Sequence, residues 1–383
     1  MLDSIPSLIE KTFPIPGRFK SKLPSDIAEL SRLLTNNRGS RSLSYLTRPN
    51  FLSAYLYYFF PCNLYRLCLL LPSLNLNLKA DNLITDLGSG PLTFTSALWI
   101  SRPELRNLPL EFNCVDRSTP VLEAGKKFFA ALCESFDCKN VLWKINLIKE
   151  DVDIRQVKNA KKRKSASLVC AVNMFNEIYE NLSHNNAEGL RQMAKNAAQT
   201  MHNEAAKNAS ILTVEPGVPQ SGKFISLLRY ALMELGHPPS SPCTHTKTCP
   251  LSIISSAKTL KGRNWIDTKK RWCHFAYETI DAPKELRRLS ADAKLPKERL
   301  VFSFLLTGQP SAQLTAKTTE ARVISDAFPL PYNRYGRYAC CERGLILIQG
   351  EKERIENAVS GSTVQISATG QHDKKSGAMI SAL

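Results

Sequence analysis

The chain has 383 residues, enough for one large domain with additions or for two or three smaller ones. A hydrophobic fraction of 43% is that of an ordinary globular protein and excludes a wholly disordered chain. The formal net charge is +17, and residues 241–300 alone hold 13 Lys and Arg against 6 Asp and Glu. This surplus favours a polyanionic partner, RNA in particular, over a basic surface that serves solubility alone.

The N-terminal sequence and the cysteines indicate a reducing compartment. The first thirty residues include Asp3 and Glu10 and lack a continuous apolar run, which argues against a secretory signal and a transit peptide. The most apolar stretch, 51–72, is interrupted by Pro61 and Arg66 and predicts a pair of buried helices, not a membrane span. The 11 cysteines are then expected to be reduced or metal-bound. We expect a cytoplasmic protein with no membrane-embedded part.

The periodicity of apolar residues divides the chain into a helical start and an alternating middle. Residues 1–75 predict helices, and from residue 82 strands alternate with helices, as in a parallel sheet covered on both faces. The expected helices are 27–34, 49–59, 63–71, 93–100, 120–136, 187–200 and 224–235. The expected strands are 83–87, 110–115, 141–145, 167–174, 210–214, 299–306, 337–341 and 345–348.

A glycine loop follows the first predicted strand and opens a helix. It comprises Asp86, Gly88, Ser89 and Gly90 in the order Asp-Leu-Gly-Ser-Gly-Pro. A tight glycine turn at such a junction lets the backbone approach a ligand closely, beside the free N–H groups of the helix. The third glycine of a dinucleotide fingerprint and the Lys-Ser/Thr of a Walker loop are both absent. The loop resembles the first motif of class I S-adenosylmethionine-dependent methyltransferases, and this resemblance implies that Asp116, at the end of the second strand, holds the ribose hydroxyls.

The fourth predicted strand ends in polar residues near the expected methyl donor. Asn173, Asn176 and Glu177 are candidates to orient a substrate or to accept a proton, and they are equally suited to cap the next helix. At this position the sequence has neither the Asn/Asp-Pro-Pro-Tyr/Phe element of amine methyltransferases nor the Pro-Cys nucleophile of enzymes that methylate pyrimidine carbon. Asn176 and Glu177 are therefore weak catalytic candidates.

Three cysteines stand in segments that do not resemble a hydrophobic core. Five residues separate Cys243 from Cys249 in a polar loop broken by prolines, and Cys273 follows after 23 more residues, between Trp272 and His274. Reduced thiols in such a setting predict a metal or iron–sulfur site. A late pair, Cys340 and Cys341, is the expected source of a fourth ligand.

Zinc and iron–sulfur remain alternatives at this point. Thiolates suit both, and His245 or His274 can replace one of them at zinc. No C-x-x-C pair is present, and the wide, irregular spacing favours a cuboidal cluster.

Taken in order, these motifs resemble the methyltransferase-like proteins that assemble the small ribosomal subunit in mitochondria and that have bacterial relatives (the Rsm-twenty-two type). The resemblance covers about residues 25–350. It rests on Tyr45-Leu-Thr-Arg-Pro-Asn-Phe-Leu-Ser-Ala-Tyr-Leu, the glycine loop, Val115-Asp116-Arg-Ser, Asn176-Glu177, Val214-Glu215-Pro-Gly217, Pro242-Cys243 to Cys249-Pro250, and Trp272-Cys273-His-Phe.

This resemblance implies an α/β protein with the class I methyltransferase (Rossmann-like) fold, bound S-adenosylmethionine, a four-iron, four-sulfur cluster, and small-subunit ribosomal RNA as partner, the protein being a monomer away from the ribosome. The implied cluster ligands are Cys243, Cys249, Cys273 and either Cys340 or Cys341, with Cys340 preferred. The expected organisation is an N-terminal helical region (1–75), a methyltransferase-like domain (76–308) with a cysteine-rich insertion (236–275), a small β extension with the fourth cysteine (309–350), and a disordered tail (351–383).

Three functions agree with these motifs. The first is an RNA methyltransferase with a structural cluster. The second is a non-catalytic assembly factor that binds S-adenosylmethionine and RNA. The third, a zinc-containing methyltransferase for a small molecule, is disfavoured by the basic surplus, because a small substrate does not require it.

Overall fold

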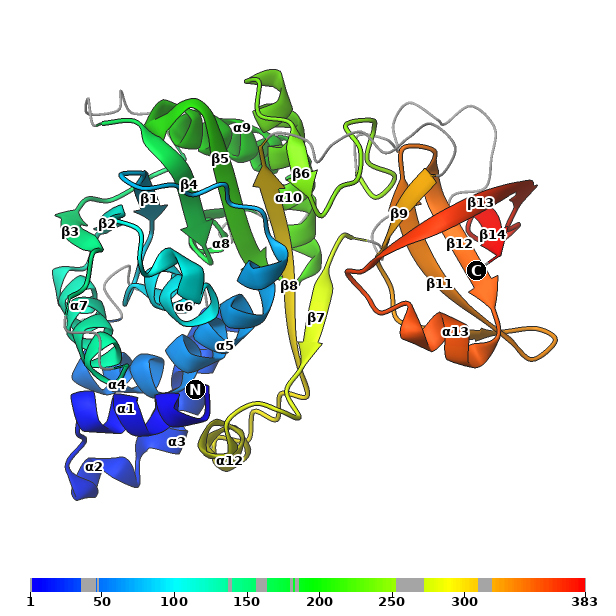
Figure 1. Cartoon of the computed structure of the whole chain (residues 1–383). Coiled ribbons are helices and arrows are strands. Elements are labelled where there is room, and N and C mark those ends of the chain that lie inside the picture. Colours follow the sequence, from blue (N-terminus) through cyan, green and yellow to red (C-terminus); the bar gives the residue numbers. More distant parts are fainter. Residues whose placement is uncertain are drawn as a thin grey trace. The chain divides into compact units, whose positions relative to one another are not determined.

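The computed structural model describes residues 2–35, 46, 48–136, 140–155, 164–179, 182, 186–252, 272–308 and 319–382 (Figure 1). The chain forms two compact units. One comprises Met1–Ser183, Asn203–Ala209 and Tyr277–Leu300, and the other comprises His184–His202, Ser210–Ala276 and Val301–Leu383. The units do not divide at the predicted boundaries 75 and 308. The N-terminal helices share a unit with the first four strands, and residues 301–383 belong to one unit.

The first unit begins with packed helices. Ile27 and Leu30 are fully buried and share a core with Phe51, Tyr58 and Leu286. The predicted break near Pro61 is a π-helical turn within one continuous helical segment, because proline lacks the N–H that a regular helix requires. The elements are η1 (Leu2–Ser4), α1 (Ile5–Thr12), α2 (Gly17–Lys20), α3 (Leu23–Thr35), α4 (Pro49–Ala54), the π turn η4 (Tyr55–Phe59), α5 (Phe60–Leu70), η5 (Leu71–Ser73) and, later in the chain, α12 (Lys284–Asp292).

The same unit contains four parallel strands, β1 (Leu83–Leu87), β2 (Glu111–Asp116), β3 (Lys144–Lys149) and β4 (Ala166–Val172). Every residue of β1 is buried, as expected for a strand covered on both faces. The order is β3-β2-β1-β4, so the connections leave β1 in opposite directions. A ligand crevice is expected at the carboxyl ends of β1 and β4, where this reversal occurs. The connecting elements are α6 (Thr93–Ser101), η6 (Pro103–Leu105), α7 (Thr119–Glu134) and α8 (Asn176–Tyr179).

The second unit continues the alternation of helices and strands. Strand β8 is antiparallel to both β5 and β6. The complete order of the sheet is β3-β2-β1-β4-β5-β8-β6, and β7 also pairs with β8. The elements are α9 (Ala187–Glu204), β5 (Ala205–Pro216), α10 (Pro219–Glu234), β6 (Pro239–Ser241), β7 (Phe275–Glu278) and β8 (Arg299–Thr307). Of the predicted cysteine-rich insertion, residues 253–271 lie outside the described residues.

The second unit ends in a closed β-barrel. Strand β9 pairs with both β11 and β13, and this double pairing closes a ring with the order β9-β11-β12-β14-β13-β9. Ala339, Cys341, Ile346 and Ile348 are buried inside it. The elements are β9 (Thr319–Val323), β10 (Phe328–Leu330), β11 (Arg334–Cys341), β12 (Gly344–Gly350), α13 (Lys352–Asn357), β13 (Thr363–His372) and β14 (Met379–Ala382).

The barrel corrects the prediction of a disordered tail at 351–383. This segment supplies α13, β13 and β14, and Ile355 and Ile366 are buried in the barrel core. The Gly/Ser/Lys-rich composition of this segment suggested disorder. Its strands are stabilised by pairing with β9 and β12, and such pairing cannot be read from the local composition because the partners lie far away in the sequence. The predicted small β extension is therefore part of a larger barrel. Among all described helices, none combines the length and hydropathy of a membrane-spanning segment.

Candidate functional site

The glycine loop connects β1 to α6. Gly88 and Gly90 have φ angles of +68° and +53°, in the left-handed region that favours glycine. A Cβ atom on Gly88 would lie 2.6 Å from Cγ of Met174, so the loop closely approaches the segment that follows β4. The Ser89 amide donates to the Val115 carbonyl at 3.0 Å, and this bond ties the loop to β2. The close approach of the loop backbone to Met174 therefore explains why residue 88 is glycine.

Asp116 ends β2 and is bonded to the loop. Its Oδ2 accepts a hydrogen bond from the Gly90 amide at 3.0 Å, and its Oδ1 accepts one from the Ser118 amide at 2.9 Å. Burial raises the pKa of this carboxyl, and the nearby Glu177 charge adds to the effect. Each carboxylate oxygen retains acceptor capacity beyond its one amide bond.

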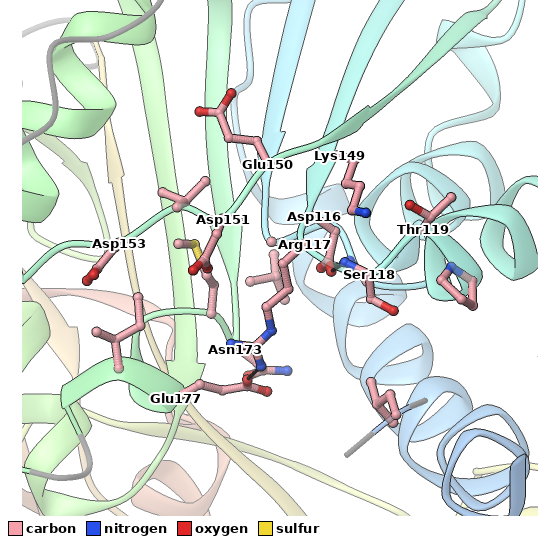
Figure 2. Close-up of a pocket in the computed structure, with 18 of the residues that line it drawn as sticks. Asp116, Arg117, Ser118, Thr119, Lys149, Glu150, Asp151, Asp153, Asn173 and Glu177 are labelled. Atoms are coloured by element: carbon pink, nitrogen blue, oxygen red, sulfur yellow. Dashed lines mark hydrogen bonds and ion pairs between the residues drawn. The ribbon is translucent and has the colours of Figure 1, made fainter. Parts of the chain in front are cut away.

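These residues line a cavity of about 540 Å³ at the carboxyl ends of the strands. Its size is typical of sites for small molecules and cofactors. Five carboxylates and three cationic side chains lie in its wall, so the wall favours a ligand with positive charge. The acidic side chains are Asp116, Glu150, Asp151, Asp153 and Glu177, and two of the basic ones are Arg117 and Lys149 (Figure 2). The third basic side chain is Arg155.

Two of the predicted polar residues at the end of β4 contact arginines. Asn173, with φ of +53°, accepts a hydrogen bond from Nη2 of the buried Arg66 at 2.9 Å. Oε2 of Glu177 forms an ion pair with Nη2 of Arg117 at 3.1 Å. Figure 2 shows the Arg117 side chain extending from the end of β2 toward Glu177. Asn176 begins α8 and is absent from the lining of the cavity.

Sequence reasoning missed two contributions to this cavity. Tyr55, in the π turn of the N-terminal helices, lines it, and burial followed by the charges of Glu177 and Asp116 raises the pKa of its phenol. The acidic run Glu150–Asp153, directly after β3, lines it as well. The sequence contained signals for both contributions. One was the pair of polar residues Asn63 and Arg66 within a largely apolar helix, and the other was the run of acids directly after a strand.

Asp86 lies beneath the glycine loop and is 1% exposed. Burial raises the pKa of its carboxyl from 3.8 to about 7, although Oδ1 accepts a hydrogen bond from the Cys170 thiol at 3.3 Å. Its Oδ2 is buried and lacks a hydrogen-bond partner among the described residues. The protonated form is therefore favoured by folding.

We expect Asp86 to make the protein less stable as the pH rises. The folded-state pKa exceeds the unfolded one, so the stabilising contribution is complete below about pH 4 and is lost as the pH approaches 7. One proton of difference gives a slope of up to about 1.4 kcal/mol per pH unit. Urea unfolding of wild type and Asp86→Asn in parallel, from pH 4.5 to 7.5, should show this slope in the wild type and a flatter profile in the variant. Parallel profiles would contradict the assignment.

The four candidate cluster cysteines come from separate elements of the second unit. Cys243 and Cys249 follow β6, Cys273 precedes β7, and Cys340 lies in β11. Burial, and next the charges of Cys243 and Cys249, raises the pKa of Cys273 well above its ordinary value. The pKa of Cys340 is raised in the same way, by burial and then by Cys243, Cys273 and Cys249. These mutual effects put the four thiols within electrostatic range of one another.

Cys341 points to the other face of β11. It is fully buried in the barrel core, together with Ala339 and Ile346, whereas Cys340 is not part of that core. Adjacent residues of a strand have their side chains on opposite faces, so only one of the two cysteines can face the other three.

A buried cation lies against the thiols. Arg229 of α10 is 3% exposed, and its Nη2 donates to the carbonyls of His245 and Lys247 at 2.9 and 2.8 Å. Its Nε and Nη1 are buried and lack hydrogen-bond partners among the described residues. The neighbouring Tyr230 hydroxyl accepts a bond from the Cys249 amide at 2.8 Å. In the described part of the chain, however, no group of three or more His, Cys, Asp or Glu is arranged to hold a metal ion.

The sheet order and the site together define the class of the protein. Parallel strands with β8 inserted antiparallel between β5 and β6, and a glycine loop and acid at the carboxyl ends of β1 and β2, constitute the class I S-adenosylmethionine-dependent methyltransferase fold. This confirms the predicted fold class.

The family is shown by the sequence itself. Residues 80–329, well over half of the chain, match the family described as mitochondrial small ribosomal subunit Rsm22, and the chain belongs to this family. The resemblance drawn from the motifs is thereby confirmed, and it links a methyltransferase-like fold to the small ribosomal subunit. No curated protein sequence matches the chain.

Solved structures with similarity to the chain include two candidate methyltransferases. One, a candidate class I S-adenosylmethionine-dependent enzyme of Listeria monocytogenes, is 10% identical over 82% of this chain and 87% of that chain, with a TM-score of 0.36. The other, a candidate RNA methyltransferase of Pyrococcus horikoshii, is 12% identical over 66% of this chain and 86% of that chain, with a TM-score of 0.32. At this level of similarity the strand order, and not these structures, defines the fold.

Proposed function

We propose that the chain binds S-adenosylmethionine in the cavity at the ends of β1–β4 and acts on or holds small-subunit ribosomal RNA during subunit assembly. The observation that carries this proposal is the cavity itself, with the Gly88 turn and Asp116 at its wall, in a member of the Rsm22 family. The net charge of +17 supports a polyanionic partner. A monomeric state away from the ribosome and a cytoplasmic location remain predictions.

The residues present fit this cofactor. The sulfonium and ammonium groups of S-adenosylmethionine are cationic, and carboxylates outnumber basic groups in the wall. Asp116 is positioned to accept the ribose hydroxyls with its remaining lone pairs, and the Gly88 turn leaves room for close approach. When bound, the cofactor supplies an electrophilic methyl group; the protein's part is to orient it and to exclude water.

We further propose that Cys243, Cys249, Cys273 and Cys340 hold a four-iron, four-sulfur cluster with a structural role. Four thiolates on a cuboidal cluster stand farther apart than ligands of one zinc ion, which approach it to about 2.3 Å. A cluster with four thiolates is anionic, and the unpaired N–H groups of the buried Arg229 fit such a charge. Its bonds would connect the barrel strand β11 to the segments beside β6 and β7.

A second candidate function is a non-catalytic assembly factor. The observation that favours it is the engagement of Asn173 by Arg66 and of Glu177 by Arg117, because these side chains were the candidates for handling a substrate proton. In this alternative, bound S-adenosylmethionine stabilises the fold and no methyl group is transferred.

One experiment separates the two candidates. Small-subunit RNA modifications and subunit maturation are compared in a strain lacking the protein and in strains carrying wild type or Gly88→Val. For an enzyme, we expect one methyl mark to be lost, restored by wild type and not restored by the variant. Defective assembly with every mark intact would assign the scaffold function, and normal marks with normal assembly would contradict both.

A further inference from the structure

The C-terminal barrel has the topology of an oligonucleotide-binding (OB) fold. Counting β9, with its continuation β10, as the first strand, the ring has the order 1-2-3-5-4-1. The single helix α13 lies between the third and fourth strands, and the third and fifth strands, β12 and β14, are parallel. OB barrels bind their ligands on the face of strands two and three, between the loop joining strands one and two and the loop joining strands four and five. The family match ends at residue 329, before four of these strands.

The corresponding face of this barrel carries an aromatic surface. Residues of β11 alternate, so Ala339 and Cys341 point into the core and Tyr338 points outward. The half-buried rings of Tyr338 and Phe328 lie 5.1 Å apart. Beside them Gly336 is buried under apolar side chains, since a Cβ there would lie 2.8 Å from Cδ1 of Leu330 and 3.1 Å from Cδ1 of Leu347.

The first of the two loops presents an exposed ring. Tyr332, in the turn between β10 and β11, is 96% exposed. Both Tyr332 and Asn333 have left-handed φ angles, +60° and +54°, and such a position favours Gly or Asn over an aromatic residue. Neither packing nor turn geometry therefore accounts for tyrosine at this position. A large ring held in water at the edge of an aromatic face is suited to stacking on a ligand.

Positive charge lies at the same two loops. Arg334 is exposed next to the first loop, and Lys374 and Lys375 are exposed in the second, between β13 and β14. The carboxylate of Asp373 in that loop accepts hydrogen bonds from Ser376. The other acids of the barrel lie outside both loops, namely Glu320, Asp326, Glu342, Glu351, Glu353 and Glu356. Arg334, Lys374 and Lys375 therefore outnumber Asp373 at the two loops, although the total charge of the barrel is close to balanced.

We propose that this barrel binds single-stranded RNA at the Arg334 end of the outer face of β11 and β12, with Tyr332 and Tyr338 stacking on bases and Arg334, Lys374 and Lys375 contacting phosphates. Cys340 lies on the same face toward the other end of β11, where the thiols are. Stacking requires bases that are not already paired in a helix, which selects single strands over duplex. The basic loops favour a polyanion over a neutral sugar chain. This inference deepens and rests on the RNA binding proposed above, and it assigns that binding to a module outside the methyltransferase fold.

The test measures binding of the full chain to a fluorescent 12-nucleotide RNA of mixed sequence and to the same strand in a duplex, by anisotropy. Tyr332→Ala should weaken single-strand binding at least about fivefold, and Tyr332→Phe should restore it, because loss of a stacked base costs about 1–3 kcal/mol. Lys374→Glu/Lys375→Glu should lower the slope of log K against log salt by about 1.4. Lys352→Glu/Arg354→Glu makes the same charge change on α13 and should leave the slope close to wild type.

Two outcomes would overturn the inference while leaving RNA binding intact: wild-type binding that prefers the duplex, or single-strand binding that Tyr332→Ala leaves unchanged. Heparin, a polyanion without bases, serves as a second probe. Equal losses of heparin and RNA affinity in Tyr332→Ala would contradict base stacking. A wild-type chain that binds no RNA would contradict the proposed function as a whole. Because Tyr332 is almost fully exposed, its variants are expected to melt like wild type.

Discussion

Replacing Gly88 with valine is expected to abolish binding of S-adenosylmethionine. The backbone at Gly88 is left-handed, and an added Cβ would lie 2.6 and 2.8 Å from Cγ and Cβ of Met174. These are atoms close to the backbone, so a rotation at the end of the methionine side chain does not relieve the clash. The loop would have to move away from β4 and from Asp116, which the Gly90 amide contacts at 3.0 Å. Isothermal titration calorimetry should show affinity reduced by about 100-fold or more, since the loop supplies both close approach and donor groups.

A matched control separates this clash from the cost of the backbone conformation. Gly236 also has a left-handed φ, of +85°, but a Cβ there meets nothing within 4 Å. Gly236→Val should therefore lose stability, by about 1–2 kcal/mol, and retain cofactor binding. If Gly88→Val binds the cofactor as tightly as Gly236→Val does, the cofactor lies elsewhere.

Cys340→Ser is expected to remove most of the iron from the protein, whereas Cys341→Ser is expected to keep it. The pKa of Cys340 is raised by burial and by Cys243, Cys273 and Cys249, whereas Cys341 lies in the barrel core. A serine hydroxyl in that apolar core lacks the solvation it has in water and should cost about 1–3 kcal/mol of stability. We therefore expect Cys340→Ser to lose the metal and Cys341→Ser to lose stability.

Anaerobic purification provides the measurement. The wild type should be brown, with broad thiolate-to-iron absorbance and an iron content near that of a four-iron cluster. Cys340→Ser should be nearly colourless, and Cys341→Ser should be brown with a lower melting temperature. Colour lost in Cys341→Ser and kept in Cys340→Ser would reverse the assignment. A colourless wild type with stoichiometric zinc would falsify the cluster itself.

The alternating core of the fold was accessible from the sequence because its signals are local. Strands β1, β2 and β4 are short apolar runs that precede helices, and β8 is a further apolar run, so all four appear within a few residues of the predicted positions. Strand β3 begins at Lys144, three residues later than predicted, because the apolar side chains of Val141 and Leu142 precede the strand and are exposed.

The N-terminal helices illustrate a contribution that local patterns do not reveal. Their helical periodicity was readable, but the contact between Arg66 and Asn173 joins residues 107 positions apart. Tyr55 likewise reaches the cavity from a π turn. Which polar residue of a helix faces a distant cavity depends on how that helix packs.

Sequence alone determined the family, the class of fold and the residue types that bear chemistry: the glycine loop, Asp116 and the thiols. These follow from short motifs, whose spacing is set by one turn or one strand. Only the tertiary structure decided that Cys341 belongs to the barrel core and Cys340 does not, that arginines engage Asn173 and Glu177, and that residues 351–382 complete a barrel. The reason is physical: strand pairing, burial and charge contacts join residues far apart in the chain, and their energies appear only when the chain is folded.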